Sequence, residues 1–233
     1  MKNIFAVGTG PGAAEYLTLQ AVNAIKNADI IFAPDNKGKQ MALDTAKEFI
    51  NGKKIILLDF PMGFVSQEHY KNAAEMIIEK TEEEKSSVIL TIGDPMIYST
   101  FIYLLPYFKK SKINLKIIPG ITSFTAAAAI SKTPLAKKGE VLTVTDHLNP
   151  LITANSDSIA LLKTYKQKET AIDEFEKNGL DYVYIKRASL EGETVLRSNN
   201  KQKILTDGNY ISLMLARKTN KTEISESKKE EDN

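Results

Sequence analysis

Short apolar runs alternate with amphipathic stretches through the first half of the chain. Each run has the length of a buried strand, and together they cover residues 3–7, 30–33, 54–58, 88–92 and 115–118. The stretches between them repeat apolar residues at helical spacing, over residues 18–26, 41–50, 67–84 and 99–109. This alternation predicts right-handed β-α-β units, and so a mostly parallel sheet with helices on both faces.

The pattern changes after Pro119 and Gly120. A helical stretch at 122–131 is followed by more closely spaced strand-like runs, at 141–145, 159–163, 182–186, 193–196 and 210–215. The last two runs are separated by turn residues without a helical pattern, which predicts antiparallel neighbours in a mixed sheet. We therefore predict two α/β domains, an N-terminal one over 1–118 and a C-terminal one over 119–218.

Composition narrows the classes of function. The last 15 residues, 219–233, are almost all charged or polar, which predicts a disordered tail. The 31 basic and 29 acidic residues leave a net charge of +2, which argues against nucleic acid as a partner. The chain has no cysteine and only two histidines, His69 and His147, so we expect no metal site. No apolar run reaches the length of about 18 residues that a membrane span needs, and we expect a soluble cytoplasmic protein.

Two glycine-proline turns follow predicted strands. Gly8-Thr9-Gly10-Pro11-Gly12 follows the first strand, and Gly93-Asp94-Pro95 follows the fourth. Ligands bind at the carboxyl ends of parallel strands, so these turns predict a small-molecule cleft. These features also have purely structural interpretations. The second turn can be an ordinary turn in which Asp94 caps the helix that follows. Thr122 or Ser123, after the fifth strand, can be the cap of the next helix.

The first turn also satisfies a dinucleotide fingerprint. Gly8, Gly10 and Ala13 have its spacing, and Asp35 lies about 20 residues further on, where a ribose-binding acid is sought. Pro11, however, has no N–H group to offer a pyrophosphate, and Glu15 adds a negative charge nearby. An NAD-dependent oxidoreductase is therefore the remote alternative.

Three segments in this order and spacing resemble the tetrapyrrole methylase family: 7–12 with 16–19, 93–100 and 118–123. The similarity runs from about residue 2 to 218. Within the family the chain is most similar to the precorrin-2 C20-methyltransferases, through residues 58–62, 98–100 and 210–214. It departs from that subgroup at Gly63 to Val65 and at Thr145 to Asn149, two segments that could line the substrate site.

The resemblance implies two α/β domains with S-adenosylmethionine in the cleft between them, and a homodimer. It places eight residues at cofactor-binding positions: Pro11, Gly93, Asp94, Ile97, Thr122, Ser123, Leu162 and Ala188. The implied reaction moves the methyl group to C20 of precorrin-2 or its cobalt complex, and S-adenosylhomocysteine leaves. Alternatives are a family member acting on another ring carbon or on diphthamide precursors, and a ligand sensor without turnover.

Such a transfer needs no covalent nucleophile on the protein, because orientation and exclusion of water suffice. A base could remove the displaced proton, and the candidates are Asp146, His147 and Tyr98, with His147 as a surface residue the simpler interpretation. The carboxylates of a tetrapyrrole call for cations at the strand ends. Candidate cations there are Arg187 and Lys163, and also Lys186.

Overall fold

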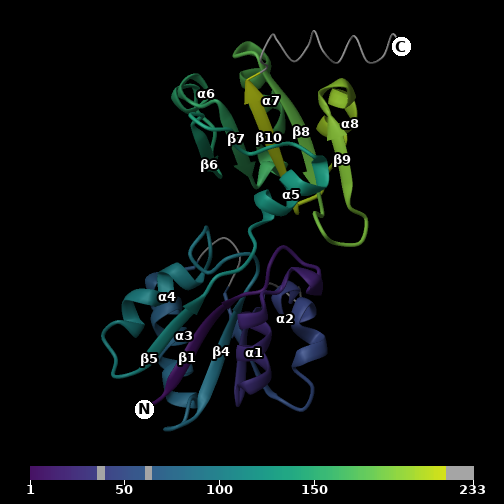
Figure 1. Cartoon of the computed structure of the whole chain (residues 1–233). Coiled ribbons are helices and arrows are strands. Elements are labelled where there is room, and N and C mark those ends of the chain that lie inside the picture. The colour runs from purple at the N-terminus through teal and green to yellow at the C-terminus, as the bar shows by residue number, and fades with distance from the viewer. Residues whose placement is uncertain (36–39, 61–64, 219–233) are drawn as a thin grey trace. The chain divides into compact units, whose positions relative to one another are not determined.

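The computed structural model describes residues 1–35, 40–60 and 65–218 (Figure 1). The chain divides into two compact units, Met1–Ser123 and Phe124–Asn233, whereas the sequence-based boundary lies between Ile118 and Pro119. The predicted tail at 219–233 lies outside the described residues, as do residues 61 and 62 of the similar segment and residues 63 and 64 of the first departure.

The first unit contains a five-stranded sheet in the order β3-β2-β4-β1-β5. Its strands are β1 (Asn3–Gly8), β2 (Ile30–Asp35), β3 (Lys54–Asp59), β4 (Ser86–Thr91) and β5 (Asn114–Ile118). Every pair of neighbours is parallel, so the predicted parallel sheet is confirmed. Parallel pairing brings the carboxyl ends of β1, β4 and β5 to one edge of the sheet. The segments that carry the motifs follow these three strand ends.

Helices cover both faces of this sheet (Figure 1). They are α1 (Leu19–Asn27), α2 (Met41–Ala46), α3 (Gln67–Lys80) and α4 (Phe101–Phe108). Strand β2 explains the two layers, because Ile30 and Phe32 pack with α3 and α4 while Ile31 and Ala33 pack with α1 and α2. Alternate side chains of a strand point to opposite faces, and both faces here are buried.

The second unit contains a mixed five-stranded sheet in the order β6-β7-β10-β8-β9. Its strands are β6 (Leu142–Thr145), β7 (Ser158–Leu162), β8 (Leu180–Lys186), β9 (Thr194–Arg197) and β10 (Ser212–Lys218). Strands β6 and β7 are parallel and the other neighbours are antiparallel, which confirms the mixed sheet. The prediction that the last two strands are neighbours is wrong: β10 inserts between β7 and β8 because it is apolar on both faces, and β9 forms a hairpin with β8 at the edge.

Among the described residues, the α-helices that accompany the second sheet are α5 (Ser123–Ser131), α6 (Pro150–Asn155), α7 (Lys168–Lys177) and α8 (Lys201–Thr206). Helix α5 packs on one face, where Ala127 joins Ala160 and Leu213. Helices α7 and α8 pack on the other, through residues such as Phe175 and Ile204. The segment between β9 and β10 therefore contains a helix, α8, that the sequence pattern did not predict.

Candidate functional site

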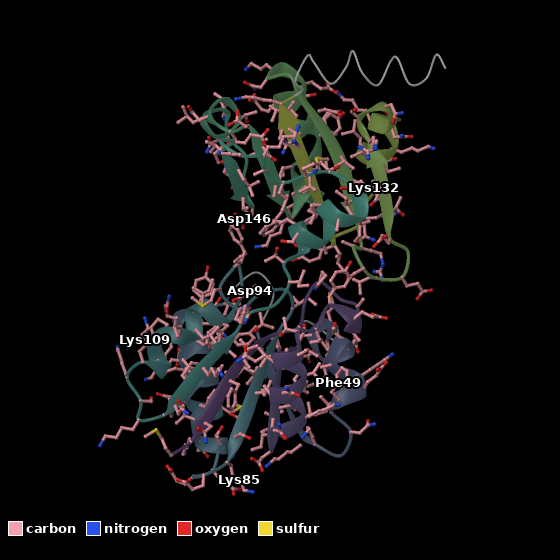
Figure 2. All side chains as sticks on the ribbon, viewed as in Figure 1. Phe49, Lys85, Asp94, Lys109, Lys132 and Asp146 are labelled. Atoms are coloured by element: carbon pink, nitrogen blue, oxygen red, sulfur yellow. The ribbon has the colours of Figure 1, made fainter. Side chains whose placement is uncertain are left out.

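Backbone atoms join the loops after β1 and β4 at the carboxyl edge of the first sheet. Gly10 and Gly93 form an isolated antiparallel bridge, in which the Gly10 N–H donates to the Gly93 carbonyl over 3.2 Å and the Gly93 N–H donates to the Gly10 carbonyl over 2.7 Å. The Thr9 N–H donates to the Thr91 carbonyl at 2.8 Å. Figure 2 shows Asp94 at this end of the sheet and Lys85 at the opposite end.

Three glycines let these loops and the loop after β5 touch. A Cβ atom on Gly8 would lie 2.5 Å from the Gly120 nitrogen and 2.6 Å from the Gly93 carbonyl oxygen. A Cβ atom on Gly120 would lie 2.1 Å from the same oxygen. Real side chains do not approach backbone so closely, so Gly8, Gly93 and Gly120 form a junction of three loops that only glycine at positions 8 and 120 permits.

The Asp94 carboxylate fastens this glycine junction from one side. Its Oδ1 accepts from the Met96 N–H at 2.8 Å, and its Oδ2 accepts from the Gly120 N–H at 3.0 Å. Helix α4 starts only at Phe101, so Asp94 is not a helix cap and the structural alternative of a cap is wrong. Asp94 instead ties the β4 loop to the β5 loop while remaining partly exposed.

The geometry of the first turn disfavours a pyrophosphate. The Thr9 and Gly10 amides already donate within the protein, and Pro11 has no N–H and is buried. The first α-helix after the turn begins at Leu19, where Thr18 caps it by accepting from the Ala21 N–H. A dinucleotide fingerprint works through free amides and an adjoining helix N-terminus, which this turn does not present in that arrangement.

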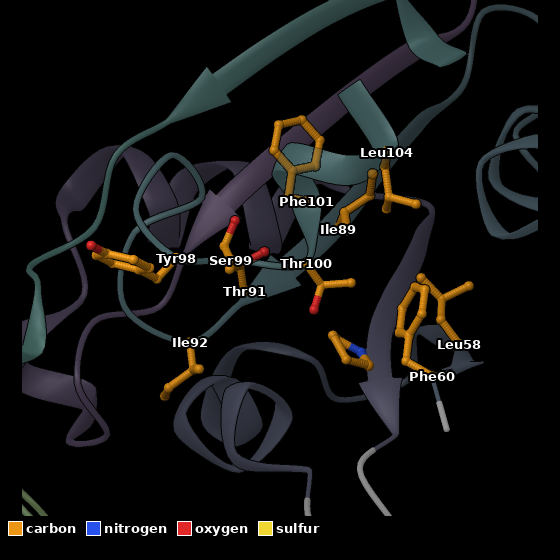
Figure 3. A pocket seen from close by; sticks show the side chains of 11 residues that line it. Leu58, Phe60, Ile89, Thr91, Ile92, Tyr98, Ser99, Thr100, Phe101 and Leu104 are labelled. Carbon is orange, nitrogen blue, oxygen red and sulfur yellow. The ribbon is translucent and has the colours of Figure 1, made fainter. Parts of the chain in front are cut away.

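An apolar surface adjoins the glycine junction. Ile92, Met96, Ile97 and Tyr98 are 39%, 47%, 38% and 46% exposed, although all are large apolar or aromatic residues. Beside them lies a cavity of about 110 Å³ (Figure 3), lined by the ends of β2, β3 and β4 and the start of α4. An apolar patch at a strand edge is typical of a site for the hydrophobic part of a small molecule.

Tyr98 stands out in this loop because its backbone is left-handed, with φ of 48°. Non-glycine residues rarely adopt this conformation, which costs about 1 kcal/mol or more and is common at functional sites. The side chain is half-exposed and contributes to the wall of the cavity (Figure 3). Its placement is compatible with contact to a ligand at the apolar surface.

The second sheet brings its own predicted residues to one edge. Strands β6, β7 and β8 all run in the same direction, because β10 is antiparallel to both β7 and β8. Asp146 and His147 follow β6, Leu162 ends β7, and Ala188 follows β8 closely. The predicted residues of this unit lie far apart in sequence but share one sheet edge: Asp146, His147, Leu162, Lys163, Lys186, Arg187 and Ala188.

The charged residues at this edge differ in their surroundings. Lys163 pairs with Asp146 at 3.2 Å, with side chains 50% and 38% exposed, so the pair can exchange partners with a ligand. Lys186 is less accessible, because its Nζ is 2.7 Å from Asp207 in a pair that is 27% and 13% exposed. Arg187 uses its Nε to donate to the Glu191 carbonyl.

Two residues at this edge share the left-handed backbone of Tyr98. The φ angles of Lys163 and Arg187, each directly after a strand, are 53° and 51°. His147 is exposed, and its N–H donates to the Thr145 hydroxyl at 3.1 Å. The roles of Tyr98, Asp146 and His147 as bases stay predictions, as do the cofactor contacts and the placement of the cofactor between the domains.

The fold and these motifs agree with known proteins. A family model described as Tetrapyrrole (Corrin/Porphyrin) Methylases matches residues 3–203. The chain belongs to this family. A probable cobalt-precorrin-2 C(20)-methyltransferase from Methanocaldococcus jannaschii is 36% identical over 203 residues, 84% of this chain and 87% of that protein. A cobalt-precorrin-2 C(20)-methyltransferase from Salmonella typhimurium is 31% identical over 173 residues, 70% of this chain and 73% of that protein.

A solved member of the tetrapyrrole methylase family shows the same fold. The crystal structure of uroporphyrin-III C-methyl transferase from Thermus thermophilus, complexed with S-adenosylhomocysteine, superposes with a TM-score of 0.69. It is 16% identical, with 92% of this chain and 97% of that chain covered. In residues 1–35, 40–60 and 65–218, no helix is long and apolar enough to cross a membrane, and no three acidic or histidine residues are grouped as a metal site would need.

Sequence reasoning missed two parts of the site. Gly8 and Gly120 were recognised within motifs, but not the backbone contact between them, because it joins residues 112 positions apart. Asp207 and Asn209, which lie beside Lys186, were interpreted only as turn residues before the last strand. The Asp-Gly-Asn sequence indicates a turn and carries no signal of an ion pair.

Proposed function

We propose that this chain is an S-adenosylmethionine-dependent methyltransferase that methylates C20 of cobalt-precorrin-2, or of metal-free precorrin-2. The observation that carries the proposal is the 36% identity to the Methanocaldococcus jannaschii protein over most of both chains. The Salmonella protein named for the same reaction supports it. The cobalt ion would then arrive within the substrate.

The chemistry of the first sheet edge suits this cofactor. S-Adenosylmethionine contains a sulfonium cation and no phosphate, and when bound it supplies an electrophilic methyl group to C20. The edge presents an apolar surface that includes Ile97, and beside it the partly exposed carboxylate of Asp94. We assign cofactor binding to the residues that the resemblance implies: Pro11, Gly93, Asp94, Ile97, Thr122, Ser123, Leu162 and Ala188.

The residues of this chain would act mainly by binding and orienting the substrate. Orientation and exclusion of water lower the barrier when the reacting carbon is already nucleophilic. We assign recognition of the substrate carboxylates to Arg187 and Lys163, which follow the carboxyl ends of β8 and β7 on either side of β10. The C20 proton that the new bond displaces would pass to a base, for which Asp146, His147 and Tyr98 are the candidates.

The proposal is tested by incubating the purified protein with methyl-labelled S-adenosylmethionine and either precorrin-2 or its cobalt complex. We expect one methyl group at C20, located by mass and by the carbon position in the product. A label at another ring carbon, or on a diphthamide precursor instead, would replace the proposed substrate with another of the family. Absence of label on either tetrapyrrole would contradict the proposal.

We also propose a homodimeric, cytoplasmic enzyme, on the resemblance to the family alone. Light scattering behind size-exclusion chromatography measures the mass of the native assembly. A mass of one chain, about 25.9 kDa, would contradict the dimer.

A further inference from the structure

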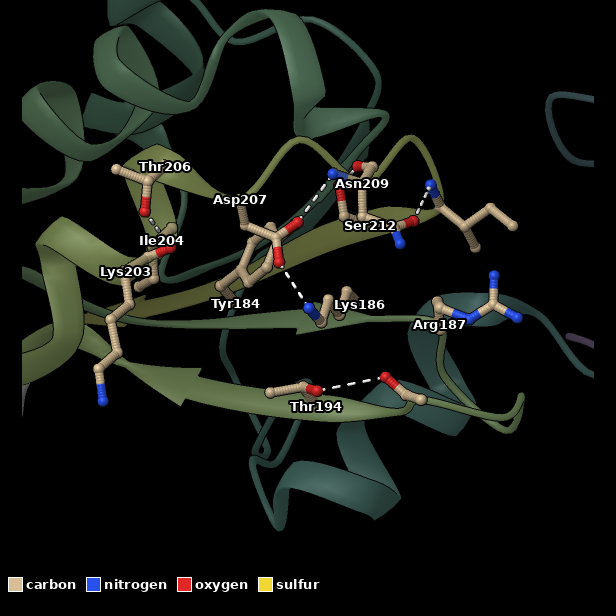
Figure 4. Close-up of polar contacts among 12 residues, drawn as sticks. Tyr184, Lys186, Arg187, Thr194, Lys203, Ile204, Thr206, Asp207, Asn209 and Ser212 are labelled. Atoms are coloured by element: carbon tan, nitrogen blue, oxygen red, sulfur yellow. Dashed lines mark hydrogen bonds and ion pairs between the residues drawn. The ribbon is translucent and has the colours of Figure 1, made fainter.

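A largely buried carboxylate, that of Asp207, contacts Tyr184 and Lys186 of β8 near the strand end that Arg187 follows (Figure 4). Asp207 Oδ1 accepts from the Tyr184 hydroxyl at 3.0 Å and from the Asn209 N–H at 2.8 Å, and its Oδ2 faces Lys186 Nζ at 2.7 Å. Its side chain is 13% exposed. Burial raises the pKa of Tyr184 to about 12, so its hydroxyl stays protonated and donates to the carboxylate.

Hydrogen bonds continue from this carboxylate to the strand end. Asn209, whose N–H is held by Asp207, accepts the Ile211 N–H with its Oδ1 at 2.9 Å. The Ile211 carbonyl in turn accepts the Arg187 N–H at 2.9 Å. Arg187 has the left-handed φ of 51°, and Ala188 comes next. Asp207 thus contacts β8 directly through the side chains of Tyr184 and Lys186, and reaches the Arg187 backbone through Asn209 and Ile211.

The backbone of Asp207 is anchored separately. Lys168, which is 7% exposed, donates to the Asp207 carbonyl and, at 2.9 Å, to the Ile204 carbonyl. Its ammonium group also lies 5.6 Å from the centre of the Tyr184 ring. The carboxylate is therefore fixed to the body of the domain, and the strand end takes its position from it.

A similar cluster forms around Tyr182, which lies two residues before Tyr184 in β8. Glu176 accepts from the Tyr182 hydroxyl at 3.0 Å and from Lys201 Nζ at 2.7 Å. These two contacts match the tyrosine and lysine contacts of Asp207 in type and distance, but the ion pair is more exposed, at 39% and 46%. Within the described part of the chain, the Glu176 side chain makes no hydrogen bond to the sheet edge that carries the predicted binding residues, so Glu176 serves as a control.

We propose that Asp207 is a positioning residue for cofactor binding, which it supports by fixing the left-handed backbone of Arg187 and hence the place of Ala188. The inference rests on the proposed function, since Ala188 is assigned there to the cofactor. Asp207 contacts neither residue directly. Its effect passes through Tyr184 and Lys186 of β8 on one path, and through Asn209 and Ile211 on the other.

The test compares Asp207→Asn, Asn209→Ala and Glu176→Gln in the full chain. Asp207→Asn keeps the size of the side chain but leaves Lys186 without its negative partner. Asn209→Ala removes only the acceptor of the Ile211 N–H, so it tests the second path if the first variant fails to fold. Calorimetric titration with S-adenosylhomocysteine should show Kd raised about tenfold in the first two, as expected for a lost constraint on a strained residue.

Two further measurements separate positioning from general stability. The KM for S-adenosylmethionine should rise in Asp207→Asn, with kcat at saturation changed less than about twofold, because Asp207 touches no reacting atom. Glu176→Gln should bind S-adenosylhomocysteine with the same Kd as the wild-type protein. Equal weakening by Glu176→Gln, or unchanged affinity in both Asp207→Asn and Asn209→Ala, would overturn the inference.

Hydrogen exchange distinguishes this inference from the proposed function. The amide of Arg187 should exchange faster in Asp207→Asn and Asn209→Ala than in Glu176→Gln, without any ligand present. If the unchanged protein binds no S-adenosylhomocysteine, the proposed function fails while the exchange rates still report on the hydrogen-bond path. If it binds the ligand but the Arg187 amide is equally protected in all variants, the positioning role of Asp207 fails alone.

Discussion

The two sheet edges that carry the predicted binding residues are held together by different kinds of contact. In the first unit, Gly8, Gly93 and Gly120 bring backbone against backbone, and one carboxylate, Asp94, fastens them. In the second unit, the contacts at the edge are ion pairs between side chains, Lys186 with Asp207 and Lys163 with Asp146. The first edge should therefore be intolerant of added volume, whereas the second should be sensitive to charge.

The largest expected effect is from Gly120→Ala. The new Cβ would lie 2.1 Å from the Gly93 carbonyl oxygen and 2.8 Å from the Gly8 carbonyl carbon, so the loops must separate. We expect a loss of at least about 3 kcal/mol in the free energy of unfolding, since backbone rather than a flexible side chain is in the way. Urea denaturation followed by circular dichroism measures it.

Gly208→Ala is the control, because no atom lies within 4 Å of its added Cβ. It should change the free energy of unfolding by less than about 1 kcal/mol. A Gly120→Ala protein as stable as Gly208→Ala would show that the junction of the three loops is not tight.

The next effect concerns charge in the second unit, through Asp207→Asn. Removal of one partner from a largely buried ion pair costs about 3 kcal/mol near neutral pH. Burial alone would raise the pKa of Asp207, but hydrogen bonds from Lys186, Asn209 and Tyr184 outweigh it and lower that pKa below its usual 3.8. The stabilisation is therefore present above pH 3.8 and is lost as the pH falls further.

Denaturation at a series of pH values checks this. The difference between the unchanged protein and Asp207→Asn should be constant above about pH 5 and shrink towards about pH 2. A difference that does not depend on pH would mean that the Asp207 carboxylate contributes by shape and not by charge.

A smaller loss is expected from Asp94→Ala. It removes a charged acceptor from the Met96 and Gly120 amides, which lie 2.8 and 3.0 Å away. Hydrogen bonds to a charged group suggest a loss of about 2 kcal/mol in the free energy of unfolding, moderated by solvent at this partly exposed site. Asp94→Asn retains one acceptor oxygen, so its free energy of unfolding should lie between those of the wild-type protein and Asp94→Ala. Denaturant unfolding of the three proteins measures this order.

The smallest effect is from Asp146→Asn, which breaks the exposed pair with Lys163. Exposed pairs contribute less than about 1 kcal/mol and are screened by salt. Thermal unfolding at low and high salt should show a small difference that disappears at high salt. A loss as large as that of Asp207→Asn would remove the contrast between the two ion pairs of this edge.

The parallel sheet could be predicted because its strands are short apolar runs that alternate with helices, as β1 and β4 illustrate. Helix α7 was not predicted because Lys168 to Lys177 is rich in charge, and its buried apolar face consists of Ala171, Ile172 and Phe175 alone. The place of β10 between β7 and β8 depends on pairing between distant segments, which local pattern does not encode.

The site was predictable to a similar extent. Turns after apolar strands indicate the sheet edge at which we propose that the ligand binds, and the family motifs include Gly93 and Asp94. Neither reveals that Gly120 touches Gly8, nor that Lys186 is occupied by Asp207. Both contacts join residues that are far apart in sequence and come together only in the folded chain, so local sequence patterns do not indicate them.

The bridge between Gly10 and Gly93 has a consequence for motion. Because each amide donates to the other residue's carbonyl, neither loop can shift by itself without losing both bonds. Gly120, held by Asp94 and pressed against Gly8, joins the same unit. Opening or closing of this edge must then be a concerted event of all three loops, with a single relaxation rate shared by residues about 110 positions apart.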